Sequence, residues 1–574
     1  MKRTAFGKIM LILLPLLPPL AVEAQNYKFP LNKEMSMSAN FGEIRGGHFH
    51  SGIDLRVGGA PGAEVYAAES GYVARIFVSP TGYGKALYIE HPDGRTSVYA
   101  HLDRFAGKIA EYVENYQYSR QRFTVNDYPA SKLLSVKKGD VIGFAGNSGS
   151  SGGAHLHFEI RETARHAPIN PVTTGYFKPK DNIPPTIHKL ALFTLDTIND
   201  ITRPRLLKSL ELVKRGQYYE PVAGETVEVC NPVFFAIEAD DRQPENTSKH
   251  GINVMKAYLN GGRFFGYRID GFDFSVTKFV NSLIAYDELI SSKTVYIKTY
   301  VEEGNKLPLY EGVKNNGILS LPDTSPHEAL IEVFDDSGNK SSLRFKIRRS
   351  ASVAVKHQTA NSAQFITMLA DDDFEYANEE FSFTLEPNSL YSDALFKIET
   401  GRRQDAYSNA ISVGYKTVPL HKSAKLRIKP LSLPSRLRNH AFVGGLDDKE
   451  KKTVYHGGQF DADGFLATSV STFGTYFISV DTIAPKISVA SKSDNYSNRD
   501  KLAVSLSDDL SGISSYNCYI DGKWALFEYD PKTQSGFCPL SAKRLGAKGK
   551  RRKMKLVVSD KCKNTATFNY SFVY

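Results

Sequence analysis

Two histidines on one short stretch are well placed for metal chemistry. His155 and His157 stand two residues apart in a segment that runs from Ser151 to Glu159. In an extended strand, side chains two residues apart point to the same face and lie roughly 6.5–7 Å from each other. We therefore predict that His155 and His157 project side by side, so that one can bind a zinc ion while the other handles protons beside it.

A second set of candidate ligands lies upstream, in the segment His50-Ser-Gly52-Ile-Asp54. The glycine lets the backbone fold tightly, so that the imidazole of His50 and the carboxylate of Asp54 converge. With His157 they form a His/Asp/His set of three protein ligands, which leaves one tetrahedral position for water, as catalytic zinc sites do. His48 also pairs with His50 as H-x-H. We prefer His50 because Asp54 follows four residues on, and we assign His48 to the wall of the site.

The residues around these histidines have the pattern of short β-strands. Aromatic and β-branched residues are frequent between turns that contain glycine, and the expected strands lie at 64–68, 71–77, 86–91 and 96–102. Residues 105–122 break the pattern, because apolar side chains recur there at helical spacing. We predict a helical insertion just after His101, which is either a surface helix without a role or a wall of a substrate groove.

These motifs together resemble those of the lysostaphin/LytM-type zinc metallopeptidases. The resemblance covers about residues 35–180. It implies a compact antiparallel β domain with a groove, and an enzyme that cuts peptides of bacterial peptidoglycan. The motifs occur in the family's order: His50-x-Gly52-x-Asp54, Gly82-Tyr83-Gly84, Tyr99-Ala-His101-Leu102, Lys138-Gly139-Asp140-Val-Ile-Gly143 and His155-Leu-His157-Phe-Glu159.

The resemblance also implies a role for each candidate site residue. The implied Zn²⁺ ligands are His50, Asp54 and His157. The implied catalytic residues that do not bind the metal are His101 and His155. One of these two histidines would take a proton from water, and the other, or both, would support the tetrahedral oxyanion and the leaving amine. No metal or catalytic position of the family is lost.

The surroundings of the predicted centre leave alternatives open. Glu159 lies on the same strand face as His157, and it either orients a neighbouring ligand or forms a surface salt bridge. Tyr83 and Tyr99 either line the groove or pack in the core. The insertion after His101 is the main departure from the family pattern, and it puts the substrate preference in doubt but not the metal centre.

The long C-terminal part repeats itself. The segment that begins at Asp181 resembles the one that begins at Asp481, and each is followed by an acidic turn and a similar closing segment. Short alternating strands predict β-sandwiches that resemble bacterial immunoglobulin-like modules, so the predicted fold class is all-β. The predicted divisions are a signal peptide at 1–24, a LytM-type zinc peptidase domain at 25–181 with the insertion at about 105–122, immunoglobulin-like β-sandwiches at 182–350 and 484–574, and a further β-sandwich at 351–483.

The start of the 574-residue chain has the pattern of an export signal. Lys2, Arg3 and Lys8 accompany an apolar run at 9–20 and a small-residue segment that ends at Ala24, as in secretory signal peptides. No later stretch approaches the ~20 apolar residues of a membrane span, so we expect no transmembrane segment in the mature chain. We place the protein in the periplasm or cell envelope, with the cell exterior as the alternative.

Composition limits the classes of function further. The formal net charge of +10 suits an anionic surface such as a cell envelope. The chain has no P-loop, no dinucleotide fingerprint and no aromatic-basic nucleic-acid motif, so we expect no nucleic-acid partner. No cysteine pair has C-x-x-C spacing, which argues against a cysteine zinc site. Two interpretations of Cys230, Cys518, Cys538 and Cys562 stay open. Either one disulfide forms among the three cysteines near the C-terminus, or the cysteines are small buried thiols.

The first functional hypothesis is a secreted zinc metalloendopeptidase that hydrolyses peptide cross-links or stem peptides of peptidoglycan. Its β-sandwich modules would position it or dock envelope or wall-hydrolase partners. The alternative is a non-catalytic LytM-type scaffold that binds wall peptide or activates a partner amidase, and the intact ligand set argues against it. A third hypothesis is a secreted zinc peptidase that acts on proteins instead of the cell wall.

Overall fold

The computed structural model describes residues 27–224, 226–244, 247–355, 357–358, 365–447, 449, 451–490 and 493–574. Most regular elements are strands in largely antiparallel sheets, which confirms the predicted all-β fold. The predicted signal peptide at 1–24 lies outside the described residues. Within these ranges, no helix combines the length and apolar character needed to cross a membrane.

The N-terminal region contains the sheet that positions the site. Its main path runs β1-β4-β13-β8-β7-β6-β10, with β11 paired to β6 and β14 to β13, while β5, β12 and β9 form a second sheet. The strands of this region are β1 (Met37–Ala39), β2 (Ile44–Arg45), β3 (His48–Phe49), β4 (Ile53–Arg56), β5 (Glu64–Tyr66), β6 (Gly71–Val78), β7 (Lys85–Glu90), β8 (Arg95–Ala100), β9 (Leu102–Phe105), β10 (Val125–Asp127), β11 (Ser135–Val136), β12 (Val141–Ala145), β13 (His155–Glu162) and β14 (Ala167–Ile169).

Strand β13 carries the H-x-H pair and lies between β4 and β8. Its antiparallel register places His157 directly opposite Asp54 of β4 and Ala100 of β8. Leu156 and Phe158 alternate with the histidines and are fully buried in the core. Because successive side chains of a strand point to opposite faces, this apolar alternation directs His157 to the other face, where Asp54 meets it.

The helical insertion is present as α1 (Gly107–Arg120). It buries Ile109, Val113 and Gln117 on one side, and Gln121, which adopts the left-handed conformation, caps its C-terminal end. The apolar periodicity of the sequence thus predicted this helix correctly.

The next region shares its core with the peptidase region. Most buried apolar side chains between Tyr27 and Phe177 and most of those between Ile187 and Ile347 belong to one hydrophobic cluster. The sheet order is β21-β20-β23-β24-β17-β16-β15-β19-β22, with β18 paired to β24 and β25 to β15. The elements are β15 (Thr186–Ile198), β16 (Ile201–Arg215), β17 (Tyr218–Pro221), β18 (Val227–Val229), β19 (Phe234–Asp240), β20 (Val254–Leu259), β21 (Gly262–Arg268), η1 (Thr277–Phe279), α2 (Val280–Leu283), α3 (Tyr286–Ser292), β22 (Ile297–Lys298), η2 (Asn315–Gly317), β23 (His327–Phe334), β24 (Lys340–Arg349) and β25 (His357–Gln358).

This shared core supports the loop that leads to His50. The ring of Phe272 packs against those of Phe41 and Phe49, with centroids 5.4 and 5.5 Å away. Gly42 has φ +77°, and a Cβ atom there would stand 2.8 Å from Ile269 Cδ1. A residue with a side chain is therefore disfavoured at this turn both by backbone strain and by crowding against Ile269.

The last two regions each have a core of their own between two main sheets, as β-sandwiches do, and the third region adds a two-stranded sheet of β26 and β29. Their finer assignment as immunoglobulin-like modules stays a prediction. The third region contains β26 (Ile366–Met368), β27 (Phe374–Ala377), β28 (Phe381–Leu385), β29 (Ala394–Phe396), β30 (Ile398–Gly401), β31 (Ala410–Val413), β32 (Ala424–Ile428), η4 (Ser435–His440), β33 (Ala441–Leu446), β34 (Thr453–Tyr455), β35 (Gln459–Phe460), β36 (Leu466–Val470) and β37 (Gly474–Val480). The fourth contains β38 (Lys486–Val489), β39 (Lys501–Ser507), β40 (Ile513–Ile520), β41 (Lys523–Ala525), β42 (Glu528–Asp530), β43 (Ser535–Pro539), α4 (Ala542–Leu545), β44 (Arg551–Asp560) and β45 (Thr565–Val573).

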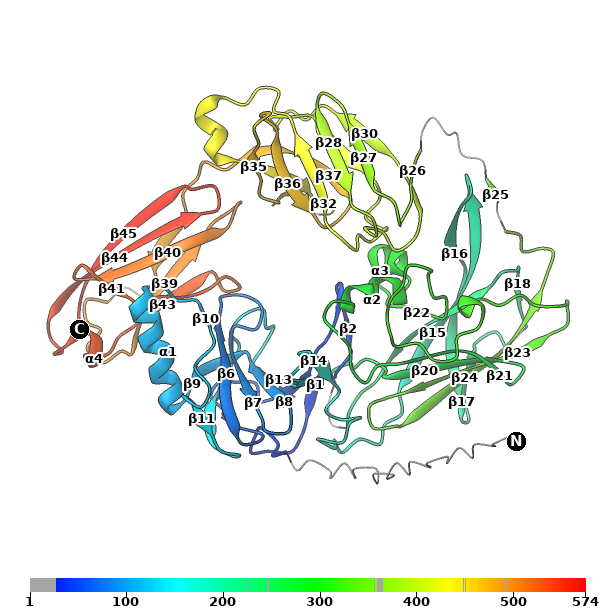
Figure 1. The fold of residues 1–574 in the computed structure, drawn as a ribbon, viewed down its shortest axis with the longest axis horizontal. Coiled ribbons are helices and arrows are strands. Elements are labelled where there is room, and N and C mark those ends of the chain that lie inside the picture. The colour runs from blue at the N-terminus through cyan, green and yellow to red at the C-terminus, as the bar shows by residue number, and fades with distance from the viewer. Residues whose placement is uncertain are drawn as a thin grey trace, which may run out of the picture.

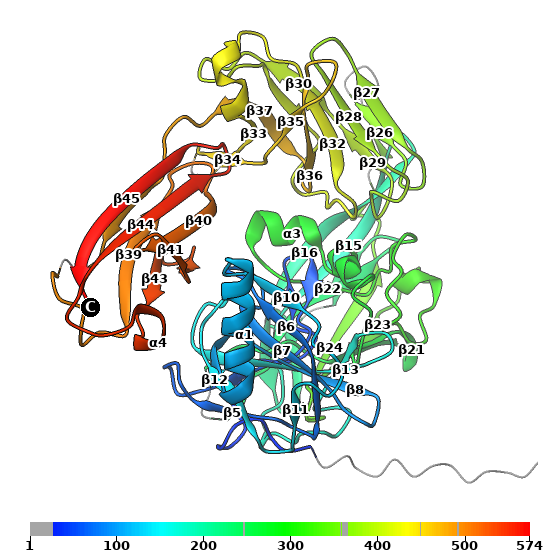
Figure 2. The same ribbon diagram turned by 60° about the vertical axis from the view of Figure 1, so that its left-hand side comes forward.

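The chain curves back on itself, so that the last region lies beside α1 (Figures 1 and 2). The ring of Trp524 meets that of Tyr118 edge-on, with centroids 5.2 Å apart. Glu114 of α1 forms ion pairs with Lys543, at 2.6 Å, and with Arg544, at 2.8 Å. The insertion therefore has a structural partner, and it is neither an idle surface helix nor simply a groove wall.

Candidate metal centre and active site

Three of the predicted residues converge at one point. His50 follows β3, Asp54 belongs to β4 and His157 to β13, and each offers a ligand atom within 4.8 Å of the other two. His157 Nδ1 lies 2.8 Å from Asp54 Oδ1, and His50 Nε2 lies 3.0 Å from both of these atoms. The atoms stand slightly closer than the ~3.3 Å edges that zinc bonds of ~2.0–2.1 Å would give a tetrahedron.

The outer nitrogens of the two imidazoles are fixed by acceptors. His50 Nδ1 donates to the carbonyl oxygen of Asn40 at 2.7 Å, and His157 Nε2 donates to Glu159 Oε1 at 2.8 Å. Each neutral ring therefore turns an unprotonated nitrogen toward the other ring and toward Asp54. Two lone pairs and a carboxylate oxygen at such short distances repel one another unless a cation or a proton lies among them. This donor set fits a metal ion.

The electrostatics of the cluster agree with that interpretation. Burial by itself would raise the pKa of Asp54, but His50 and the other histidines around it hold that pKa well below its usual range. Burial opposes a charge on His157, yet its hydrogen bonds to Asp54 and Glu159 raise its pKa to about 9. In the absence of a metal ion, a proton on His157 therefore relieves the repulsion between the ligand atoms of the cluster. Arg45 also holds the second oxygen of Asp54, Oδ2, at 3.0 Å.

Glu159 is fully buried and organises the far side of His157. Besides His157, it accepts hydrogen bonds from Ser51 Oγ at 2.8 Å, Tyr83 OH at 2.6 Å and Arg161 Nε at 2.5 Å. Of the two alternatives for this carboxylate, the surface salt bridge is therefore excluded. Glu159 orients the ring of His157, and it balances the charge of the buried Arg161.

Two further histidines stand beside the cluster. The ring centroids of His101 and His155 are 4.9 Å apart, and that of His101 is 5.8 Å from that of His157. His101 Nδ1 donates to the carbonyl of Ser148 at 2.9 Å, and His155 Nδ1 donates to that of Gly153 at 2.9 Å. Each ring therefore keeps Nε2 as the nitrogen that can accept a proton.

The two histidines differ in their environment. His155 Nε2 is buried without a hydrogen-bond partner and lies 3.4 Å from Asp54 Oδ1. Burial, and then the neighbouring rings of His157 and His155, lower the pKa of His101 to about 3. His101 is thus neutral in the physiological range. It also adopts φ +59°, a strained conformation of the kind that occurs at functional sites.

The remaining candidates lie outside this constellation. His48 is exposed, and its Nδ1 contacts the Gly46 carbonyl at 3.1 Å, in line with the choice of His50. Tyr99 is fully buried and accepts a hydrogen bond from Ala68 N at 2.7 Å, so it packs in the core and does not line a groove. All four cysteines are buried free thiols.

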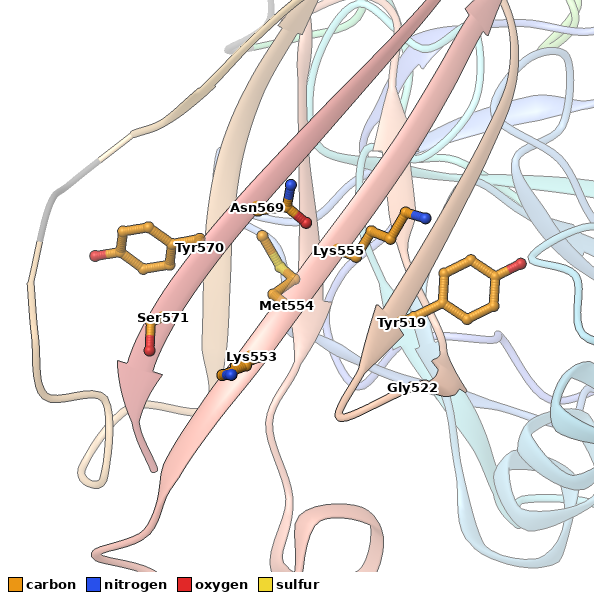
Figure 3. Close-up of a pocket in the computed structure, with 8 residues that line it drawn as sticks. All are labelled: Tyr519, Gly522, Lys553, Met554, Lys555, Asn569, Tyr570 and Ser571. Carbon is orange, nitrogen blue, oxygen red and sulfur yellow. The ribbon is translucent and has the colours of Figure 1, made fainter.

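A hollow in the surface lies against His155. Its lining includes the cationic side chains of Lys33 and Arg56, together with backbone at Gly58–Gly59 and Gly152–Gly153. Another hollow lies on the last region, where β40, β44 and β45 present lysines, tyrosines, a methionine, an asparagine and a serine (Figure 3). That lining contains no histidine or carboxylate, so it offers no metal ligands of the kind found around His157.

Comparison with known proteins assigns the N-terminal region. Residues 48–119 match the model of Peptidase family M23, and residues 366–481 match that of a Zu5-like domain. The chain carries a LytM-type peptidase domain. The match to the peptidase family ends before His155 and His157, so the placement of those two residues rests on the geometry described above.

The relatives of the LytM-type domain match it over limited lengths. The DD-carboxypeptidase/endopeptidase Mpg of Neisseria meningitidis is 30% identical over 131 residues, which are 23% of this chain and 24% of the relative. An uncharacterized metalloprotease of Haemophilus influenzae is 27% identical over 155 residues, 25% of this chain and 26% of the relative. The chain thus spans about a quarter of the length of these curated relatives.

Solved structures also match this domain. The catalytic domain of the M23 protein EnpA from Enterococcus faecalis has 25% identity and a TM-score of 0.19, and the match covers 26% of this chain and 96% of that one. The family and the name of the Haemophilus relative imply a metal ion. The cluster of His50, Asp54 and His157 is the group in the LytM-type domain that can hold it.

Proposed function

We propose that this protein is an exported zinc endopeptidase that hydrolyses peptide cross-links or stem peptides of bacterial peptidoglycan. The observation that carries the proposal is the convergence of three ligand atoms, from His50, Asp54 and His157, beside two histidines with unprotonated Nε2 atoms. The name of the Neisseria relative, which states carboxypeptidase and endopeptidase activity, supports the choice of substrate.

In this proposal His50, Asp54 and His157 hold zinc, which supplies Lewis-acid chemistry that polarises a peptide carbonyl and makes water a stronger acid. His155 Nε2, 3.4 Å from Asp54 Oδ1, is close enough to the ligands to take a proton from attacking water. His155, protonated in that step, would then pass this proton to the leaving amine, while His101, held neutral by burial with its Nε2 unprotonated, would accept a hydrogen bond from the attacking water and orient it. The carbonyls of Ser148 and Gly153 keep both rings in the required tautomer.

The hollow beside His155 supports an acidic peptide as substrate. Lys33 and Arg56 line it, and two pairs of adjacent glycines bring backbone amides to its surface. Stem peptides of peptidoglycan carry free carboxylates, which cations and backbone N–H groups attract. That the β-sandwich regions dock envelope or wall-hydrolase proteins stays a prediction.

The test is a digest of purified peptidoglycan by residues 25–574, with the products identified by mass spectrometry. We expect new peptide termini that disappear after zinc chelation and in the His155→Ala variant, but persist in the matched His48→Ala variant. Intact peptidoglycan in the presence of bound zinc, together with stimulation of a partner amidase, would instead identify a scaffold. Cleavage of casein but not of peptidoglycan would identify a peptidase that acts on proteins.

A further inference from the structure

The two repeated regions each gather three aspartates at one point. In the first, Asp181, Asp241 and Asp335 offer carboxylate oxygens within 4.8 Å of one another, and in the second Asp481, Asp508 and Asp560 do the same. The members correspond by position in the fold. One precedes the first strand of its region, one follows β19 or β39, and one stands at the end of β23 or β44.

The first cluster contains a carboxylate with an unsatisfied oxygen. Asp241 is only 4% exposed, and its Oδ1 is buried without a hydrogen-bond partner. Asp335 is 4% exposed and is held by Asn339, whose backbone N and side-chain Nδ2 donate to its two oxygens, each at 2.8 Å. Asp181 accepts a hydrogen bond from the backbone N of Ile183 at 3.0 Å. The cluster is thus built and oriented, with an unpartnered buried oxygen on Asp241.

The second cluster repeats this construction. Asp560 is held by Asn564, whose N and Nδ2 donate to its two oxygens at 2.9 and 2.7 Å. The same Nδ2 donates to the backbone carbonyl of Asp481 at 2.8 Å. Asp508 Oδ2 accepts a hydrogen bond from the backbone N of Gly512 at 2.6 Å. An asparagine four residues after the last aspartate therefore plays the same part in both regions, although the chain from Asp181 to Asp335 is much longer than that from Asp481 to Asp560.

The charges of these clusters are not balanced by protein cations. In the described parts of the chain, no ion pair joins any of the six aspartates to lysine, arginine or histidine. Burial, and then the charges of Asp335 and Asp181, raise the pKa of Asp241 to about 8. In each cluster two buried carboxylates and a half-buried one stand so close together that they require either a shared proton or a cation.

The donor set selects the kind of cation. All side-chain donors are carboxylate oxygens, which hard cations prefer, and the absence of histidine and cysteine from both groups disfavours zinc. Mg²⁺ retains several waters and demands a regular octahedron, whereas Ca²⁺ accepts irregular sets of carboxylates and backbone carbonyls. Ca²⁺ therefore suits two largely buried sites that are fixed by asparagine side chains and loop backbone.

We propose that the clusters Asp181–Asp241–Asp335 and Asp481–Asp508–Asp560 are two equivalent Ca²⁺ sites that fasten each repeated region to the chain segment preceding it. Asp181 and Asp481 belong to those connecting segments, while the other four aspartates belong to the regions themselves. A bound ion thus joins a connection to two strand ends and restricts the angle between neighbouring regions.

The first site also lies next to the support of the metal centre. Asp336, the neighbour of Asp335, accepts hydrogen bonds from Asn40 Nδ2 and Asn170 Nδ2, both at 2.8 Å. Asn40 in turn carries the carbonyl that orients His50. Ca²⁺ at the first cluster therefore stabilises the strand end on which this chain of contacts depends.

The test measures Ca²⁺ binding directly and does not depend on peptidase activity. Residues 25–574 are stripped of metal, given one equivalent of zinc, and titrated with Ca²⁺ by calorimetry, with Mg²⁺ in a parallel titration. We expect two equivalents of Ca²⁺ for the wild type, one each for Asp241→Asn and Asp508→Asn, and none for the double variant. The matched Asp509→Asn variant should retain both, because Asp509 is exposed and pairs with Lys486 at 2.6 Å.

Thermal unfolding separates a lost site from a failed fold. We expect Ca²⁺ to raise the Tm of the wild type by several degrees and that of the double variant not at all. Without Ca²⁺, the double variant should melt no lower than the wild type, because the substitutions remove like charges. The proposal would be overturned if the wild type did not bind Ca²⁺ at millimolar concentration, or if the double variant still bound it. Shared protons would then be the means by which the charges of the aspartates are neutralised.

Discussion

Replacing Glu159 by glutamine tests the supporting contacts of the proposed metal centre. The amide keeps the shape of the side chain, but it removes the charge that faces His157 and Arg161. Glu159 is 0% exposed and Arg161 only 7%, so the variant leaves a buried guanidinium without its counterion. Breaking a buried pair in this way costs about 3–5 kcal/mol. Losing a partner that orients a ligand lowers metal affinity by about 10–100-fold, or about 1.4–2.8 kcal/mol.

Two measurements on Glu159→Gln separate these effects. Competition with a chromophoric chelator gives the zinc affinity, and urea unfolding of the metal-free protein gives the free energy of unfolding. The matched control is Glu162→Gln on the same strand, since Glu162 pairs with Arg165 at the surface and should contribute less than about 1 kcal/mol. Zinc affinity equal to that of the wild type, measured beside a His50→Ala variant that has lost zinc, would refute the orienting role of Glu159.

The effect of Glu159→Gln should also depend on pH. Burial by itself would raise the pKa of Glu159, but Arg161 and His157 outweigh it and hold the pKa well below its usual range. The stabilisation by this carboxylate is therefore complete above the unfolded pKa of about 4.3 and is lost as pH falls toward the folded value. We expect the difference in unfolding free energy between wild type and variant to narrow progressively below about pH 4.

Three further predictions concern His101, Asp241 and Gly42. The His101→Ala variant should still bind zinc, as measured by atomic absorption, but its kcat should be about 10²–10⁴-fold lower than that of the wild type. A kcat equal to that of the wild type would show that His101 takes no part in the reaction. In metal-free protein, the difference in unfolding free energy between the wild type and Asp241→Asn should fall as pH rises from about 4 to 8, because Asp241, which faces Asp335, Asp181 and Asp336, binds its proton more tightly when folded. A rise of that difference over this range in chemical denaturation would contradict the prediction. In chemical denaturation, Gly42→Ala should lower the free energy of unfolding by about 1–3 kcal/mol, because alanine is strained at a φ of +77° and its Cβ crowds Ile269. An unchanged denaturation midpoint would show that the peptidase region and the next region are not tightly packed at this turn.

The sequence predicted the all-β fold and the residues that meet at the centre, because both depend on local patterns. Alternation in β13 indicates which face His157 occupies, and the glycine between His50 and Asp54 indicates a tight approach. The role of Glu159 could not be chosen in advance, since the pattern indicates its face but not its burial. Asn40 has no distinguishing spacing, and it acts through a backbone carbonyl that any residue could supply.

Long-range packing was beyond the reach of such patterns. The partners of Glu114 lie 429 and 430 residues away in the sequence, so periodicity could indicate a helix at 107–120 but not the region that covers it. The shared core between the peptidase region and the next region could not be predicted for the same reason. The sequence indicates that an apolar side chain such as Phe272 is buried, but not which residues it packs against.

The docking of the last region on α1 is intramolecular, so it takes place at a high effective concentration. The two surfaces belong to one chain, and linked partners of this kind meet at concentrations of the order of millimolar. An interface too weak to hold separate proteins together is therefore sufficient to keep the chain closed on itself. Its contacts include the ion pairs of Glu114 with Lys543 and Arg544, and of Lys85 with Glu528. Because salt screens such pairs, the fraction of closed molecules should fall as ionic strength rises.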